Sequence, residues 1–155
     1  VKDSSLKGLV EIDAGGGMIV VPKRLFSKTL FDEYLPFGYE DLDFTLRIKE
    51  MGYNVVTVTD ATVIHYKNHK QVVNALDNAI LKSFFSGRNE IIFHYRHGGA
   101  FSALIRFSIG LIQSFERVIR YLLLNRREDA VLETYRTIGL LFSMYVLRRC
   151  SRIFR

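Results

Sequence analysis

The first half of the chain alternates short apolar runs with polar turns. Residues 10–12, 18–21, 54–58 and 62–66 are apolar or β-branched runs of strand length. Pro22 can open a helical turn that continues to Leu30. Residues 41–51 place Leu42, Leu46 and Ile48 near one helical face, and Gly52 can end that helix. The order strand, helix, strand predicts an α/β fold for this half.

From residue 70 onward the pattern is helical. Apolar residues recur with a period of 3.6 over residues 72–95, until Gly98 and Gly99 interrupt the pattern. Two further helices are predicted over residues 101–124 and 128–149, separated by residues 125–127. We therefore divide the chain into residues 1–69 and a helical region of residues 70–155.

Composition limits the class of protein. The 155 residues are 48% hydrophobic and 25% charged, which excludes a disordered or low-complexity chain and fits one domain of ordinary size. Cys150 is the single cysteine, so the chain has no internal disulfide and no cysteine-based zinc site, which suits a reducing compartment. No charged or apolar leader follows Val1, so we expect no signal peptide.

Charge is unevenly distributed. Residues 1–69 hold 8 basic and 10 acidic side chains, a net charge of −2, whereas residues 70–155 hold 14 and 6, a net charge of +8. A basic region of this kind favours polyanions or anionic lipid headgroups as partners.

The last two predicted helices raise the question of a membrane. Their longest charge-free stretches are residues 107–115 and 137–147, nine and eleven residues long, whereas about 17–25 are needed to span a bilayer. Arginines flank these stretches, a pattern typical of helices that lie in a membrane interface. Packing of the same apolar residues against the α/β core or a second subunit is an equally open interpretation.

The most informative stretch carries Glu40, Asp41 and Asp43 at the predicted loop-to-helix junction. Asp41 is a suitable N-cap, and acidic residues in a first turn complement the helix dipole. Alternatively, Asp41 and Asp43 could share a divalent cation. A third possibility is that one of the acids is a general base.

His65 ends a predicted strand, a position where α/β sheets often present functional side chains. A structural role for this histidine is the alternative.

Several segments in order carry a resemblance to a known family. They are Asp13-Ala14-Gly15-Gly16-Gly17-Met18, Pro22-Lys23-Arg24-Leu25-Phe26, Phe37-Gly38-Tyr39-Glu40-Asp41-Leu42-Asp43-Phe44-Thr45-Leu46-Arg47, Gly52-Tyr53 and Val63-Ile64-His65-Tyr66. Together, residues 10–69 resemble the C-terminal part of the catalytic domain of family 2 glycosyltransferases. Residues 82–89, which end in Arg88-Asn89, are similar to a helix that follows in rhamnosyl- and galactofuranosyltransferase-like members.

The resemblance implies a fold and an activity. The fold would be the C-terminal, acceptor-side half of a GT-A (nucleotide-diphospho-sugar transferase) domain in residues 1–69, followed by the helical C-terminal region. The activity would be an inverting transfer of sugar from a nucleotide-diphosphate donor to a hydroxyl of a cell-surface glycan or lipid-linked acceptor. Asp41 matches the family's general base, and Glu40 would position that base or the acceptor.

The resemblance also implies a metal ion and substrate contacts. His65 matches a histidine that contacts Mg²⁺ or Mn²⁺, whose principal ligands lie in an upstream half of such enzymes. Gly15, Gly16 and Gly17 would let the backbone approach the donor sugar or the acceptor, although a simple turn or bulge explains them almost as well. Arg88 and Asn89 could contact a phosphate or a lipid-linked acceptor, or could join helices by hydrogen bonds.

We therefore expect a fragment of a metal-dependent glycosyltransferase for surface polysaccharide, inactive alone and peripheral to the cytoplasmic face of the membrane, where anionic lipid would be a partner. It could form a homo-oligomer. The alternative function is a non-catalytic basic helical module that docks on a membrane or partner protein. Nucleic-acid binding is not expected, since no recognised motif for it is present.

Overall fold

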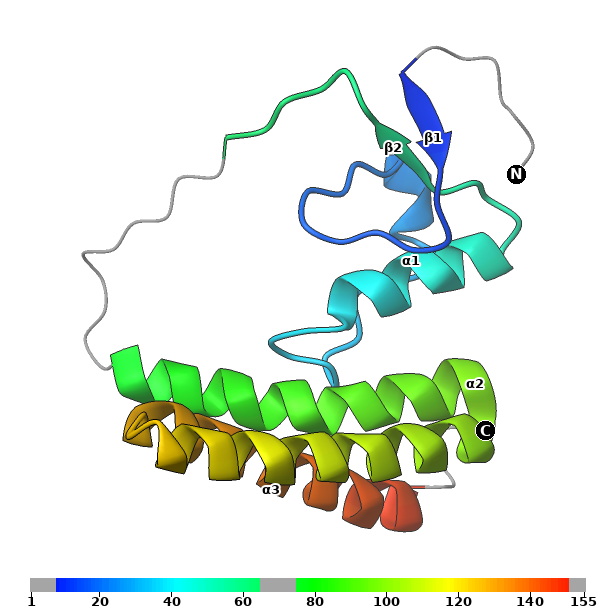
Figure 1. The fold of residues 1–155 in the computed structure, drawn as a ribbon. Coiled ribbons are helices and arrows are strands. Elements are labelled where there is room, and N and C mark those ends of the chain that lie inside the picture. Colours follow the sequence, from blue (N-terminus) through cyan, green and yellow to red (C-terminus); the bar gives the residue numbers. More distant parts are fainter. Residues whose placement is uncertain (1–7, 65–74, 151–155) are drawn as a thin grey trace. The chain divides into compact units, whose positions relative to one another are not determined.

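The computed structural model describes residues 8–64 and 75–150 (Figure 1). The elements are β1 (Leu9–Glu11), the short 3₁₀ helix η1 (Lys23–Leu25), α1 (Glu40–Glu50), β2 (Val56–Val58), α2 (Ala75–Leu123) and α3 (Arg127–Cys150). Contacts divide the described residues into two compact units. Unit 1 holds residues 8–34 and 40–64, and unit 2 holds residues 35–39 and 75–150.

The prediction of a GT-A α/β fold is wrong. Of the described residues, 65% are helical and 5% lie in strands. The one sheet among them joins β1 and β2, three residues each, in antiparallel pairing from Leu9↔Val58 to Glu11↔Val56. Residues 18–21 and 62–64, which had the composition of strands, form none. A strand needs a neighbour to pair its backbone groups, and composition alone does not supply one.

Helix α1 packs a small core in unit 1. Its start at Glu40 and end at Glu50 confirm the predicted helix within a residue. The fully buried apolar side chains are Phe44 and Ile48, which pack with Leu25 of η1, whereas Leu42 and Leu46 of the predicted inner face are only half-buried. Phe31, in the loop before α1, stacks on Phe44 with ring centroids 4.4 Å apart. This ring therefore helps to cover the face of α1 that carries Phe44.

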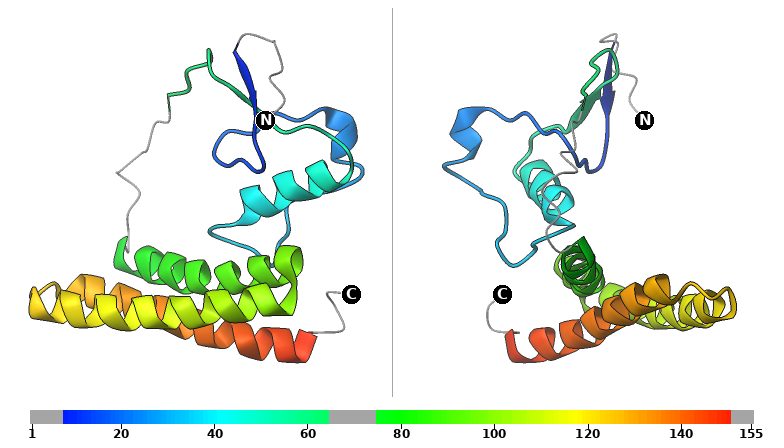
Figure 2. Two further views of the ribbon diagram at one scale, coloured as in Figure 1. Left: turned by 45° about the vertical axis from the view of Figure 1, so that its right-hand side comes forward. Right: turned by 90° about the vertical axis from the view of Figure 1, so that its left-hand side faces the viewer.

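Unit 2 consists of three helical segments. Gly99, with φ 75° and ψ −179°, breaks α2 at the predicted glycine pair, and the chain reverses there. The two halves of α2 and α3 lie side by side as an antiparallel bundle (Figures 1 and 2). Their core contains Ile91, Ile92, Ala103, Leu140 and Leu147.

Two glycines let α2 and α3 approach closely. A Cβ atom at Gly139 would lie 1.9 Å from the carbonyl oxygen of Phe84, and one at Gly87 would lie 2.1 Å from that of Arg136. Both distances are far inside van der Waals contact, so each helix requires a glycine where the other backbone crosses it.

No helix in residues 75–150 or elsewhere in the described part is both long and apolar enough to cross a membrane.

Candidate functional site

The predicted glycine loop and the predicted base meet in unit 1. Oδ2 of Asp41 accepts a hydrogen bond from the backbone N–H of Gly17 at 2.9 Å, across 24 positions of sequence. Gly16 and Gly17 are exposed and Asp41 is half-buried. Gly17 has φ 89°, a left-handed conformation that favours glycine. Oδ1 of Asp41 makes no hydrogen bond to any described residue, so this oxygen is open to a ligand.

Thr45 fastens the glycine loop to α1, a role that sequence analysis did not predict. Its Oγ1 accepts a hydrogen bond from Gly15 N at 3.1 Å, while its single hydrogen can be donated to the carbonyl of Asp41 at 2.9 Å. The side chain is 2% exposed. A threonine inside a helix commonly bonds back to the carbonyl four residues earlier, which is the only sequence signal for this contact.

Asp41 is not the cap of α1. The helix begins at Glu40, so Asp41 is its second residue, and its carboxylate bonds to the glycine loop. Glu40, the expected positioning residue, is half-buried at the start of the same turn. Although Asp41 is not the cap, the acidic side chains in the first turn of α1 complement the helix dipole.

Asp41 and Asp43 do not form a joint metal site. Asp43 is fully buried, and its Oδ2 accepts a hydrogen bond from Arg47 Nε at 2.8 Å. Arg47 also donates to Thr29 Oγ1 and, at 2.6 Å, to the carbonyl of Leu30. Residues two apart at a helix start point in different directions, so one acid faces the glycine loop while the other supports the loop before α1.

The expected Mg²⁺ or Mn²⁺ has no set of ligands in the part of the chain that the structure describes, because no group of three or more His, Cys, Asp or Glu side chains could hold a metal there. His65, the predicted metal ligand, lies outside the described residues.

Arg88 and Asn89 lie in unit 2, where both side chains are buried. Asn89 Nδ2 donates hydrogen bonds to the carbonyls of Pro36 at 2.7 Å and Gly38 at 3.0 Å. Arg88 Nη1 donates to Asn89 Oδ1 at 2.9 Å. The burial and these bonds favour the structural role for the two residues over contact with a substrate.

The loop that Asn89 holds has an unusual backbone. Phe37, Gly38 and Tyr39 have φ values of 62°, 133° and 70°, and left-handed conformations cost about 1–2 kcal/mol for a residue with a side chain. The ring centroids of Tyr39 and Phe93 lie 5.2 Å apart, and this aromatic contact offsets part of the conformational cost. Burial, reinforced by the negative charge of Glu90, raises the pKa of the Tyr39 phenol. Asn89 therefore holds the backbone of residues 36–38 within unit 2.

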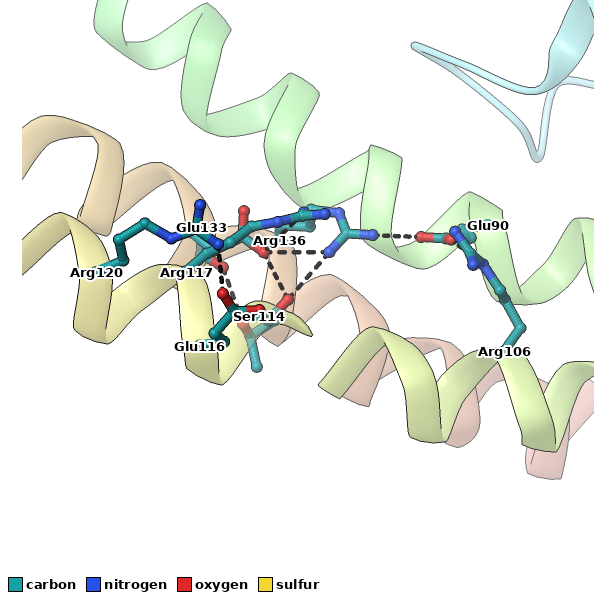
Figure 3. A network of polar contacts seen from close by, with 9 residues as sticks. Glu90, Arg106, Ser114, Glu116, Arg117, Arg120, Glu133 and Arg136 are labelled. Carbon is teal, nitrogen blue, oxygen red and sulfur yellow. Dashed lines mark hydrogen bonds and ion pairs between the residues drawn. The ribbon is translucent and has the colours of Figure 1, made fainter. Parts of the chain in front are cut away.

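A polar network crosses the helices of unit 2 (Figure 3). Glu90, whose side chain is 2% exposed, contacts Arg106 and lies 2.6 Å from Arg136 Nη2. Arg136 Nη1 also contacts Glu133 at 3.1 Å and Ser114 at 3.0 Å. These groups pair one another, so Arg106 and Arg136, two of the basic residues counted in this half, have acidic partners inside the bundle.

No family model matches the chain, and no curated protein or solved structure shows significant similarity to it.

Proposed function

We propose that the chain carries the acceptor-side part of an inverting glycosyltransferase, with Asp41 as the general base. The observation that supports this most is the hydrogen bond between Gly17 and Asp41. It joins two motifs that are 24 residues apart, and it holds one carboxylate oxygen while the other stays open.

The chemistry follows from the carboxylate. Asp41 Oδ1 would take the proton of the acceptor hydroxyl as the hydroxyl oxygen forms its bond to the anomeric carbon of the donor sugar. The bond from that carbon to the diphosphate breaks on the opposite side, and its electron pair leaves with the nucleoside diphosphate. Attack from the opposite side inverts the anomeric centre.

The exposed backbone of Gly16 and Gly17 would border the acceptor. A Cβ atom at Gly16 would lie 3.4 Å from Asp41 Oδ2, so the glycines keep the space beside the carboxylate clear of side chains. The hydrogen bond from the Gly17 amide would hold the Asp41 carboxylate in one orientation, with Oδ1 directed at the acceptor hydroxyl.

The test measures sugar transfer by the natural polypeptide that contains these residues. Asp41→Asn keeps an oxygen that accepts the Gly17 hydrogen bond but cannot take a proton, so we expect kcat to fall about 10²–10⁴-fold with little change in the donor KM. Glu50→Gln, which neutralises an acid at the other end of α1, is the matched control and should transfer at the wild-type rate. Wild-type turnover by Asp41→Asn would reject Asp41 as the base.

A further inference from the structure

The C-terminal half of α2 presents an apolar row to solvent. Its exposed members, which we call the outer face, are Phe101, Ile105, Ile112, Phe115, Ile119 and Leu123. Their spacing of three, four or seven residues places them on one side of the helix. Ile112 and Phe115 are each 71% exposed and Leu123 is 82% exposed, whereas Ala103 and Ser114 on the other side are buried in the bundle.

The exposure of the outer face argues against one interpretation left open by the sequence, packing on the core of this chain. If these residues packed on the core of this chain, they would be covered, but the bundle covers the opposite side of the helix. Single exposed apolar residues are common on protein surfaces. A row of six large ones spread along six turns of one helical side is typical of a surface that docks on something else.

The charges of the same segment indicate what that partner is. Residues 101–150 contain eight arginines and four acidic residues, a net charge of +4. Arg120 and Arg126 are each 56% exposed, and Arg127 is exposed at the start of α3. An apolar helical face bordered by exposed arginines complements a surface that is apolar below and negatively charged above.

A cavity beside the outer face supports the same partner. It has a volume of about 610 Å³ and is lined by residues that include Tyr95, Ala103, Leu104, Met144 and Arg148. Leu104 is 52% exposed and borders the outer face. Arg148 is exposed and forms no ion pair with a described carboxylate. An apolar cavity with a cation at its edge suits an alkyl chain that carries an anionic headgroup.

We propose that the outer face docks in the plane of an anionic phospholipid bilayer, with the cavity able to receive one lipid chain. This inference is independent of the proposed sugar transfer, because it rests only on residues of unit 2.

The test is cosedimentation of the 155-residue chain with vesicles of phosphatidylcholine alone or mixed with phosphatidylglycerol. We expect strong binding to the anionic vesicles, weak binding to the zwitterionic ones, and loss of binding as salt rises. Ile112→Asn/Phe115→Ser should lower the affinity at least about tenfold. Leu76→Asn/Leu81→Ser changes two exposed leucines in the first half of α2, outside the outer face, and should bind as the wild type does.

A second pair of variants tests the charge separately. Arg126→Gln and Arg127→Gln should each lower binding to anionic vesicles about fivefold. All substituted positions are exposed, so circular dichroism should show an unchanged helix content.

Two results would overturn the proposal. One is equal binding of the wild type and Ile112→Asn/Phe115→Ser to anionic vesicles. The other is a wild-type dimer in light scattering that the same substitutions dissociate, together with no vesicle binding. That result would assign the outer face to a second copy of this chain.

Discussion

Gly17 and Gly16 are neighbours with different structural demands. Gly17 has φ 89° with open space around it, whereas Gly16 has no such backbone and only ordinary contacts with Asp41. The loop therefore requires glycine for its backbone conformation at Gly17 but not at Gly16.

This difference predicts how the two positions respond to substitution. Gly17→Ala should lower the free energy of unfolding of unit 1 by about 1–2 kcal/mol, the cost of a left-handed residue with a Cβ atom. Gly16→Ala should change it by less than about 0.5 kcal/mol. Urea denaturation followed by a probe in unit 1 measures both. Equal stability of the two variants would contradict the conformation described for Gly17.

His94 gives the second residue-scale prediction, a dependence of stability on pH. Burial, reinforced by the positive charge of Arg106 and opposed by Glu90, lowers the pKa of His94 below 6.5 in the folded state. The unfolded chain therefore binds a proton more readily than the folded chain as pH falls through 6.5. We expect the free energy of unfolding to decrease below that pH.

The measurement is urea denaturation at a series of pH values for the wild type and for His94→Gln. The variant should lose less stability between neutral and mildly acidic pH than the wild type does. An identical pH dependence of the two proteins would show that His94 does not contribute.

At the scale of elements, the crossing of α2 and α3 depends on small residues. Gly139 leaves no room for a methyl group against the backbone of Phe84, whereas a Cβ atom at Gly110 would meet only the end of the Leu140 side chain at 3.2 Å. Backbone cannot move aside as a flexible side chain can.

Gly139→Ala should therefore separate the helices and destabilise unit 2 by about 1–3 kcal/mol or more. Gly110→Ala is the matched control, since it adds the same methyl group in the same bundle, and it should cost clearly less. Thermal denaturation followed by circular dichroism compares them. The prediction fails if Gly139→Ala melts at the wild-type temperature.

The polar network around Glu90 gives a second prediction at this scale, a loss of stability when one of its ion pairs is broken. Arg136→Met removes a partner of both Glu90 and Glu133 inside the bundle, and breaking a buried pair typically costs about 3–5 kcal/mol. Arg120→Met breaks an exposed pair with Glu116, which is worth about 0–1 kcal/mol. Denaturant unfolding should separate the two variants, and comparable stabilities would contradict the burial of the network.

For the whole molecule, the sequence predicted the position of a helix and of a helix break better than it predicted the sheet. The helix over residues 40–50 and the break at Gly99 were predictable because helical hydrogen bonds and glycine conformations depend on nearby residues. The GT-A sheet was wrong because short apolar runs such as residues 18–21 become strands only when another strand lies beside them.

The candidate site, too, was predictable only where local sequence carried the information. The sequence indicated Gly15–Gly17 and Asp41 as separate motifs, and the structure joins them through the hydrogen bond from Gly17 to Asp41. The support from Thr45 and the separate direction of Asp43 could not be predicted, since both depend on how the loop folds back on α1. The link from Asn89 to the loop at residues 36–38 spans more than fifty positions and has no local signal.

The rate of sugar transfer by the natural polypeptide, with and without Asp41→Asn, tests the central claim most directly. If Asp41 takes the acceptor proton, kcat of the variant should fall about 10²–10⁴-fold while its donor KM stays close to the wild-type value. A variant that keeps the wild-type kcat would contradict the account.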